Sequence, residues 1–152
     1  MKKQIIGVLL AASFATGAAA GDTATLAVSA TVTGACKFTT ATFNMNFGAL
    51  DPSAVANQNQ STALTYKCTK NQAATSFSFD TAAVSPTSVS ITNGTDSIPV
   101  ALSWAVPATQ GSGFGAGSTA ISMTVNGQIL GTDYANVSAG AYTKNVAVVV
   151  AP

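Results

Sequence analysis

Residues 97–106 read SIPVALSWAV, and this stretch carries the clearest structural pattern in the sequence. Every second residue in it is large and apolar, namely Ile98, Val100, Leu102, Trp104 and Val106. Successive side chains of a β-strand point to opposite faces of the sheet. The alternation therefore predicts a strand with one face in a hydrophobic core and the other in solvent.

The same period of two recurs on both sides of this stretch. Further alternating runs occupy residues 24–32, 43–47, 64–68, 77–79, 121–125 and 146–150. Turn-forming sequences separate the runs: Asp51-Pro52-Ser53, Ser85-Pro86, Asn93-Gly94, Asn126-Gly127 and Ala139-Gly140-Ala141. About seven or eight short strands separated by such turns predict an all-β chain folded as a β-sandwich, without a helix after the first residues.

The first 20 residues have a different composition. Lys2 and Lys3 precede an apolar run over residues 5–15, and Ala18-Ala19-Ala20 supplies small residues after it. This order is typical of a signal peptide, so we predict export and cleavage after Ala20. An uncleaved membrane anchor is the alternative, but the apolar run is shorter than the roughly 20 residues that a spanning helix needs.

Charged residues make up 7% of the chain, against roughly 25% in an average globular domain. The near-neutral balance creates no long-range field that would gather nucleic acid or anionic lipid, so neither is a predicted partner. The chain contains no His, Glu or Arg, which rules out Ser–His–Asp and Cys–His arrangements. We therefore predict a protein that is not an enzyme and has no cofactor and no metal centre.

Several residues also allow a ligand-binding interpretation. Asp51, Asp80, Asp96 and Asp133 could form a calcium site, although no DxDxDG run joins them. Trp104 could be a sugar-binding platform, but its place in the long alternation favours a core position. Residues 110–118 hold four glycines around Phe114 and are typical of a mobile loop. Asn93-Gly94-Thr95 fits a glycosylation sequon, yet a hairpin turn is the simpler interpretation.

Cys36 and Cys68 are the two cysteines, and both follow the predicted cleavage site. An isolated pair in an oxidising compartment most often forms a disulfide, worth about 3–4 kcal/mol in the chain-entropy model. A redox or metal pair is the alternative, but the spacing is not CxxC and there is no His.

The alternating run at residues 22–33 begins almost at the predicted new N-terminus and precedes Cys36. A terminal strand can pair in its own sheet, or it can leave and add to the open sheet edge of another molecule. If its apolar face inserts into the next subunit, each contact is head-to-tail and a filament follows. An ordinary first strand of the sandwich is the alternative.

Four segments follow one another in the predicted exported part: the alternating extension up to Cys36, FGALDPS at 47–53, LTYKCT at 64–69, and a closing stretch from Asp133-Tyr134 through Tyr142 to Pro152. In order and spacing they resemble the spore coat protein U domain family, which includes the major subunits of archaic chaperone–usher pili. Lys144-Asn145 stands where the family often has Asp, and the Arg-bearing segment of many members is missing. These departures concern the subfamily more than the fold.

The resemblance implies an immunoglobulin-like sandwich that lacks its last strand. It implies a signal peptide at 1–20, a donor-strand extension at 21–34 and an incomplete pilin domain at 35–152. The side chains that would enter a neighbouring subunit are Ala24, Leu26, Val28, Ala30 and Val32, and the acceptor groove would include Val146, Val148 and Val150. A periplasmic chaperone would fill the groove before an outer-membrane usher catalyses the exchange.

We therefore expect a structural subunit of a bacterial surface pilus, or fimbrium, that supports adhesion and biofilm formation. It would pass through the periplasm to the cell surface and form a head-to-tail homopolymer, without stable membrane insertion of the mature chain. The alternatives are a monomeric secreted binding module, a tip adhesin, or a spore or cell coat protein.

Overall fold

The computed structural model describes residues 21–152, and the predicted signal peptide at 1–20 lies outside the described residues. The chain divides after Thr31 into an N-terminal unit and a compact unit, Val32–Pro152. Among the described residues, the single short helix is neither long nor apolar enough to cross a membrane.

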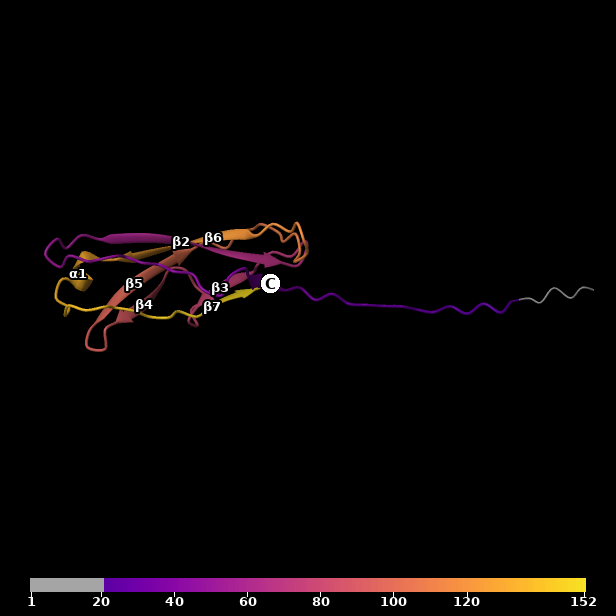
Figure 1. The fold of residues 1–152 in the computed structure, drawn as a ribbon, viewed down its shortest axis with the longest axis horizontal. Coiled ribbons are helices and arrows are strands. Elements are labelled where there is room, and N and C mark those ends of the chain that lie inside the picture. Colours follow the sequence, from indigo (N-terminus) through magenta and orange to yellow (C-terminus); the bar gives the residue numbers. More distant parts are fainter. Residues whose placement is uncertain (1–20) are drawn as a thin grey trace, which may run out of the picture. The chain divides into compact units, whose positions relative to one another are not determined.

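The regular secondary structure of the compact unit consists almost entirely of strands, joined by long loops (Figure 1). The strands are β1 (Cys36–Phe38), β2 (Gln58–Cys68), β3 (Ser76–Phe79), β4 (Thr87–Thr92), β5 (Ser97–Trp104), β6 (Ile121–Ile129) and β7 (Val148–Ala151). One helical turn, α1 (Gly131–Tyr134), follows β6. The predicted all-β class is confirmed, although the alternating runs of the sequence indicated neither β1, β4 nor this turn of helix.

The strands form two antiparallel sheets. The larger sheet has the order β1-β2-β6-β5-β4, and β3 pairs with β7 in the smaller one. The register places Leu64 of β2 opposite Met123 of β6, and Val89 of β4 opposite Val100 of β5. The Asn93-Gly94 turn joins β4 to β5, where the Asn93 side chain accepts the N–H groups of Thr95 and Asp96 at 2.9 and 2.8 Å. The predicted hairpin turn is thus confirmed.

The core lies on one face of the larger sheet and is covered by β3. Along β6, buried residues alternate strictly with exposed ones from Ile121 to Ile129. The closest aromatic contacts between the sheets are Phe79 to Trp104, with ring centroids 4.3 Å apart, and Tyr66 to Phe77 at 5.2 Å. Trp104 therefore packs within the protein, which supports the core interpretation. Each large apolar side chain buried here contributes roughly 1.5–3 kcal/mol.

The prediction of a turn at Asn126-Gly127 is wrong, because both residues lie inside β6. Gly127 faces the core, and a Cβ atom there would collide with the Met45 sulfur and lie 3.0 Å from Cζ of Phe47. The glycine therefore serves close packing in the middle of a strand and not chain reversal.

Two other alternating runs did not become strands as expected. Residues 21–35 contain no strand, so an ordinary first strand of the sandwich is not found. Phe43, Met45 and Phe47 are partly buried while Asn44 and Asn46 are exposed, yet this segment joins no ladder. Side-chain alternation is present there, but no neighbouring strand offers its backbone hydrogen bonds.

Candidate strand-binding site

β7 has one unpaired edge in the described part of the chain, since its only ladder partner is β3. Val148 lies opposite Phe79 and Val150 opposite Phe77 in this ladder. Both valines are only partly buried, and so is Val146 just before the strand. The structure thus brings the three predicted acceptor residues onto one face beside an open strand edge.

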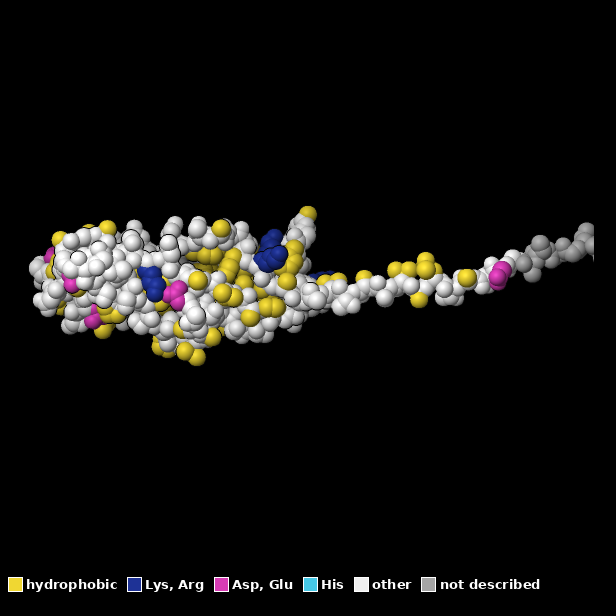
Figure 2. Space-filling view, turned by 90° about the horizontal axis from the view of Figure 1, so that it is seen from below, with side chains coloured by type: hydrophobic (Ala, Val, Ile, Leu, Met, Phe, Trp, Pro, Cys, Tyr) yellow, Lys and Arg dark blue, Asp and Glu magenta, His cyan; other side chains and the backbone are white. Residues whose placement is uncertain are grey.

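A second line of partly buried apolar side chains packs against the same core. It consists of Phe38, Phe43, Met45 and Phe47. The Phe38 ring lies 5.5 Å from Phe43 and 6.3 Å from Phe77, while Met45 and Phe47 rest on the backbone of Gly127. Figure 2 shows hydrophobic side chains gathered on the surface seen from the side of β7 and the segment that leads to it. We call the two lines together the open apolar strip.

Sequence reasoning missed this second line as part of a site. The alternation Phe43-Asn44-Met45-Asn46-Phe47 was a signal for this line, but by itself it predicts only a strand. What periodicity does not reveal is that the segment lies over Gly127 and that its side chains stay incompletely covered.

The base of the N-terminal extension is fixed to the domain. The predicted disulfide is present, joining Cys36 of β1 to Cys68 of β2, which are partners in the ladder. Thr69 donates its backbone N–H to the Ala35 carbonyl at 2.9 Å, and its hydroxyl accepts the Ala35 N–H at 3.0 Å. The chain is therefore held at Ala35, directly before β1.

The predicted donor side chains are all exposed in the single chain. Leu26, Val28 and Val32 are 86%, 85% and 83% exposed, and Ala24 and Ala30 are exposed as well. Apolar side chains at every second position of an unpaired segment leave both apolar surface and backbone groups in water.

Polar contacts hold the segment that leads to β7. Asp80 forms an ion pair with Lys144 at 2.7 Å and accepts the Ala147 N–H at 2.9 Å. The hydrogen bond from Lys144 lowers the pKa of the Asp80 carboxyl below its ordinary value. Tyr142 donates its hydroxyl to the Ser138 carbonyl at 2.8 Å, so this side chain returns to the backbone four residues upstream.

Ser138 in turn is bound by Asp96. The Asp96 carboxylate accepts the Ser138 N–H at 2.8 Å and also its hydroxyl, and these bonds lower the pKa of Asp96. Asp80 and Asp96, two of the four aspartates considered for calcium, thus bind different partners, and no three acidic or Cys side chains gather anywhere in residues 21–152.

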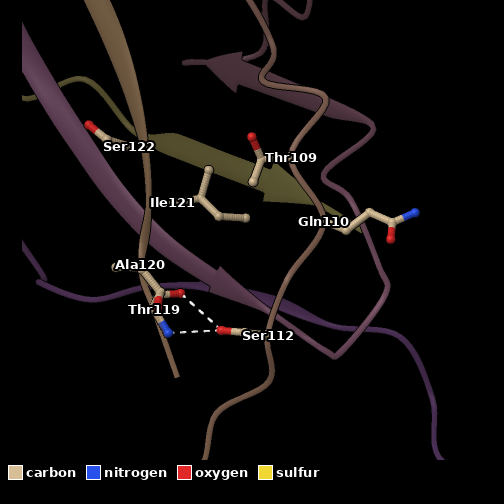
Figure 3. A pocket seen from close by; sticks show the side chains of 7 residues that line it. All are labelled: Thr109, Gln110, Ser112, Thr119, Ala120, Ile121 and Ser122. Atoms are coloured by element: carbon tan, nitrogen blue, oxygen red, sulfur yellow. Dashed lines mark hydrogen bonds between the residues drawn. The ribbon is translucent and has the colours of Figure 1, made fainter. Parts of the chain in front are cut away.

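The glycine-rich loop borders a shallow pocket of about 270 Å³ (Figure 3). Its walls come from Thr109, Gln110, Ser112 and residues 119–122, and the Ser112 hydroxyl accepts the Thr119 N–H at 2.8 Å. Ile121 and Thr109 face each other in the view, and Gln110 points away. None of the lining side chains is ionisable near neutral pH, so the pocket offers no acid or base for catalysis.

An all-β domain with a fixed disulfide, an open strand edge and an exposed alternating segment has the features of a fimbria-related protein. Residues 36–152, from the first cysteine onward, match the family model of the fimbrial adhesin MrpH C-terminal domain. The chain therefore belongs to this family, which confirms the pilus-related part of the expected resemblance. No curated protein matches the chain. No solved structure matches it either.

Proposed function

We propose that the chain is a structural subunit of a bacterial chaperone–usher fimbria that polymerises by donor-strand exchange and supports adhesion and biofilm formation. One observation carries the proposal: an exposed alternating extension and an open apolar strip beside an unpaired strand edge occur in the same chain. The extension lacks a strand to pair with, and β7 lacks a second neighbour, so the extension of one copy can pair with β7 of the next.

The energetics support such a contact. Burying Leu26, Val28 and Val32 in a neighbour would each contribute roughly 1.5–3 kcal/mol. Pairing with the free edge of β7 would satisfy backbone donors and acceptors of both strands. Ordering the extension opposes these gains by about 1–2 kcal/mol for each residue whose backbone is fixed.

In this proposal the domain is an immunoglobulin-like sandwich without its last strand, as in the spore coat protein U family and the archaic chaperone–usher pili. A periplasmic chaperone would cover the open apolar strip until an outer-membrane usher replaces it with the extension of the incoming subunit. The signal peptide and cleavage after Ala20 would direct the chain along this route.

A tip adhesin or monomeric binding module is the second candidate. The family is that of a fimbrial adhesin domain, and Phe114 is 47% exposed in the glycine-rich loop. An exposed aromatic ring on a loop can serve as a contact for a ligand. Under this alternative, ligand binding would depend on Phe114 and not on the extension.

The two candidates differ in their response to one substitution. The chain is expressed with its neighbouring chaperone and usher genes, and fibres are sought by negative-stain microscopy and by gel ladders that collapse to monomer on boiling. We expect Val28→Asp to abolish both, because a carboxylate would enter an apolar site. Ser29→Asp is the matched control, since it adds the same charge to the opposite face. A wild-type chain that stays monomeric would overturn the polymer proposal.

A further inference from the structure

The charged side chains of residues 32–152 are sorted between two ends of the domain. This unit contains four lysines and four aspartates: Lys37, Lys67, Lys70, Lys144, Asp51, Asp80, Asp96 and Asp133. Lys144 and Asp80 neutralise each other in the ion pair described above. Three lysines and three aspartates therefore remain without an oppositely charged partner in this unit.

The three lysines lie at the end where the extension leaves. Lys37 of β1 and Lys67 of β2 are direct partners in the ladder, and Lys70 follows the end of β2. The same end holds Ala35, through its hydrogen bonds with Thr69. We call this end the extension pole.

The three aspartates lie at the opposite end. Asp133 lies in α1, shortly after β6. The neighbouring Tyr134 donates its hydroxyl to the Ala56 carbonyl at 2.6 Å, which brings α1 close to the turn that contains Asp51. Asp96 is in the β4–β5 turn, bound to Ser138. Figure 2 shows acidic side chains at one end of the compact unit, lysines at the other, and the ion pair between them. We call the acidic end the far pole.

The extension pole carries an internal electrostatic cost. Like charges directly opposite each other on neighbouring strands are destabilising, and Lys37 and Lys67 stand in this relation. Lys67 donates to the Ser118 hydroxyl at 2.8 Å, a neutral group that does not compensate the charge. An acidic surface brought from outside would relieve the repulsion.

We propose that the extension pole of one subunit docks against the far pole of the next, so that lysines of one copy face aspartates of the other. The occupant of each pole is thus a second copy of this chain. The inference rests on the proposed polymerisation and adds a second contact to it, outside the inserted strand.

The geometry of the strand edge agrees with this pairing. β7 runs toward the extension pole and ends there. Its last residue, Ala151, pairs with Ser76 of β3. The segment just before β3, residues 71–73, is hydrogen-bonded to Gly111, close to Cys68 at the extension pole. A donor strand inserted antiparallel to β7 would therefore end, at Val32, beside the far pole of its acceptor. Parallel insertion would bring two lysine-bearing poles together. The charge distribution thus selects the antiparallel direction.

The contact predicts salt-sensitive assembly. Exposed charges are screened over about 8 Å at physiological ionic strength, and complementary fields raise association rates by about 10 to 10³-fold at low salt. Exchange from purified chaperone–subunit complexes, followed by ladder formation at several NaCl concentrations, measures this rate. Wild-type assembly should slow as salt is raised.

Substitutions identify the charges responsible. Lys37→Gln with Lys70→Gln should slow low-salt assembly by about 10-fold. The control Ser90→Glu with Thr124→Glu makes the same net charge change on the exposed sheet face and should leave the rate unchanged. The variant Lys37→Glu with Lys70→Glu should no longer assemble rapidly, because acidic side chains would then face each other. A variant that carries Asp51→Lys and Asp133→Lys in the same chain as well should regain the wild-type rate.

The outcomes separate this inference from the proposed function. If ladders form at the same rate in all variants and at all salt concentrations, the contact between the extension pole and the far pole is absent, while polymerisation by strand exchange is still supported. If the wild-type chain forms no ladder, polymerisation itself is overturned, and the pole contact with it. Secretion and thermal unfolding of each chaperone-bound variant show that a slow rate does not reflect misfolding.

Discussion

β6 and β7 both turn apolar residues toward the core, but of these two strands only β6 is paired on both sides. In β6 every core-facing residue is buried, whereas Val148 and Val150 of β7 remain partly exposed and Val149 is 58% exposed. The amino-acid pattern alone therefore does not determine burial. It determines which face a strand can bury, and the neighbours decide whether that happens.

The strongest way to test this difference is to give β7 its missing neighbour. A variant that carries a second copy of residues 22–33 after Pro152, on a short Gly/Ser linker, should become more stable on the order of 5 kcal/mol, because several large side chains become buried. It should also cease to polymerise. Chemical denaturation and gel filtration measure both effects. The same tail with Asp at the position of Val28 is the control, and equal stability of the two variants would contradict the prediction.

Truncation in the two strands should then have unequal effects. Met123→Ala removes a fully buried side chain and should lower the free energy of unfolding by about 2–5 kcal/mol. Val148→Ala should lower it by about 1 kcal/mol or less in the isolated chain, since the site is already open to solvent. Urea denaturation of both variants, with Val149→Ala as an exposed control, tests the ranking. Equal losses for Met123 and Val148 would show that the edge of β7 is closed.

Gly127 connects the closed part of the sheet with the open apolar strip. Gly127→Val should displace Met45 and Phe47 and lower stability by about 1–3 kcal/mol, the usual effect of overpacking. Asn126→Val is the matched control, because its side chain faces away from the core. Thermal unfolding of the two variants provides the measurement, and similar melting temperatures would contradict the packing role of the glycine.

The smallest expected effect concerns acid. The folded-state pKa values of Asp80 and Asp96 lie below the ordinary value of 3.8, so their contribution to stability is present above that value. It is lost as the pH falls through the lowered pKa values, because protonation removes the bonds to Lys144 and Ser138. Stability measured between pH 6 and pH 2 should fall at the acid end, and less so in Asp80→Asn. A steeper acid loss in that variant would reverse the assigned sign.

Much of the fold could be predicted because alternation reports side-chain direction. The strands around Leu64, Ile98 and Val148 and the hairpin at Asn93-Gly94 appear where the pattern indicated. Gly127 was misread because a glycine in a turn and a glycine under a packed side chain look alike in one sequence. Only the three-dimensional arrangement shows that Met45 occupies the missing Cβ position.

The candidate site was predictable to a similar extent. The extension and the three valines could be named from their periodicity, and the cysteine pair from its isolation. The line from Phe38 to Phe47 could not be assigned to the strip, since no rule of spacing places a segment without a ladder over a particular strand. The opposed lysines were equally hidden, because the register of β1 against β2 is a property of the fold.

The disulfide has a mechanical consequence for a fibre of the proposed kind. Tension along the fibre would enter each subunit through Ala35 and reach β1, which has only three residues in its ladder. The Cys36–Cys68 bond would carry that load covalently into β2, which is paired with β6 along most of its length. In a stretched fibre the ladder between β2 and β6 would therefore have to shear before β1 could detach from β2. With the disulfide reduced, β1 would be the first strand to detach under load.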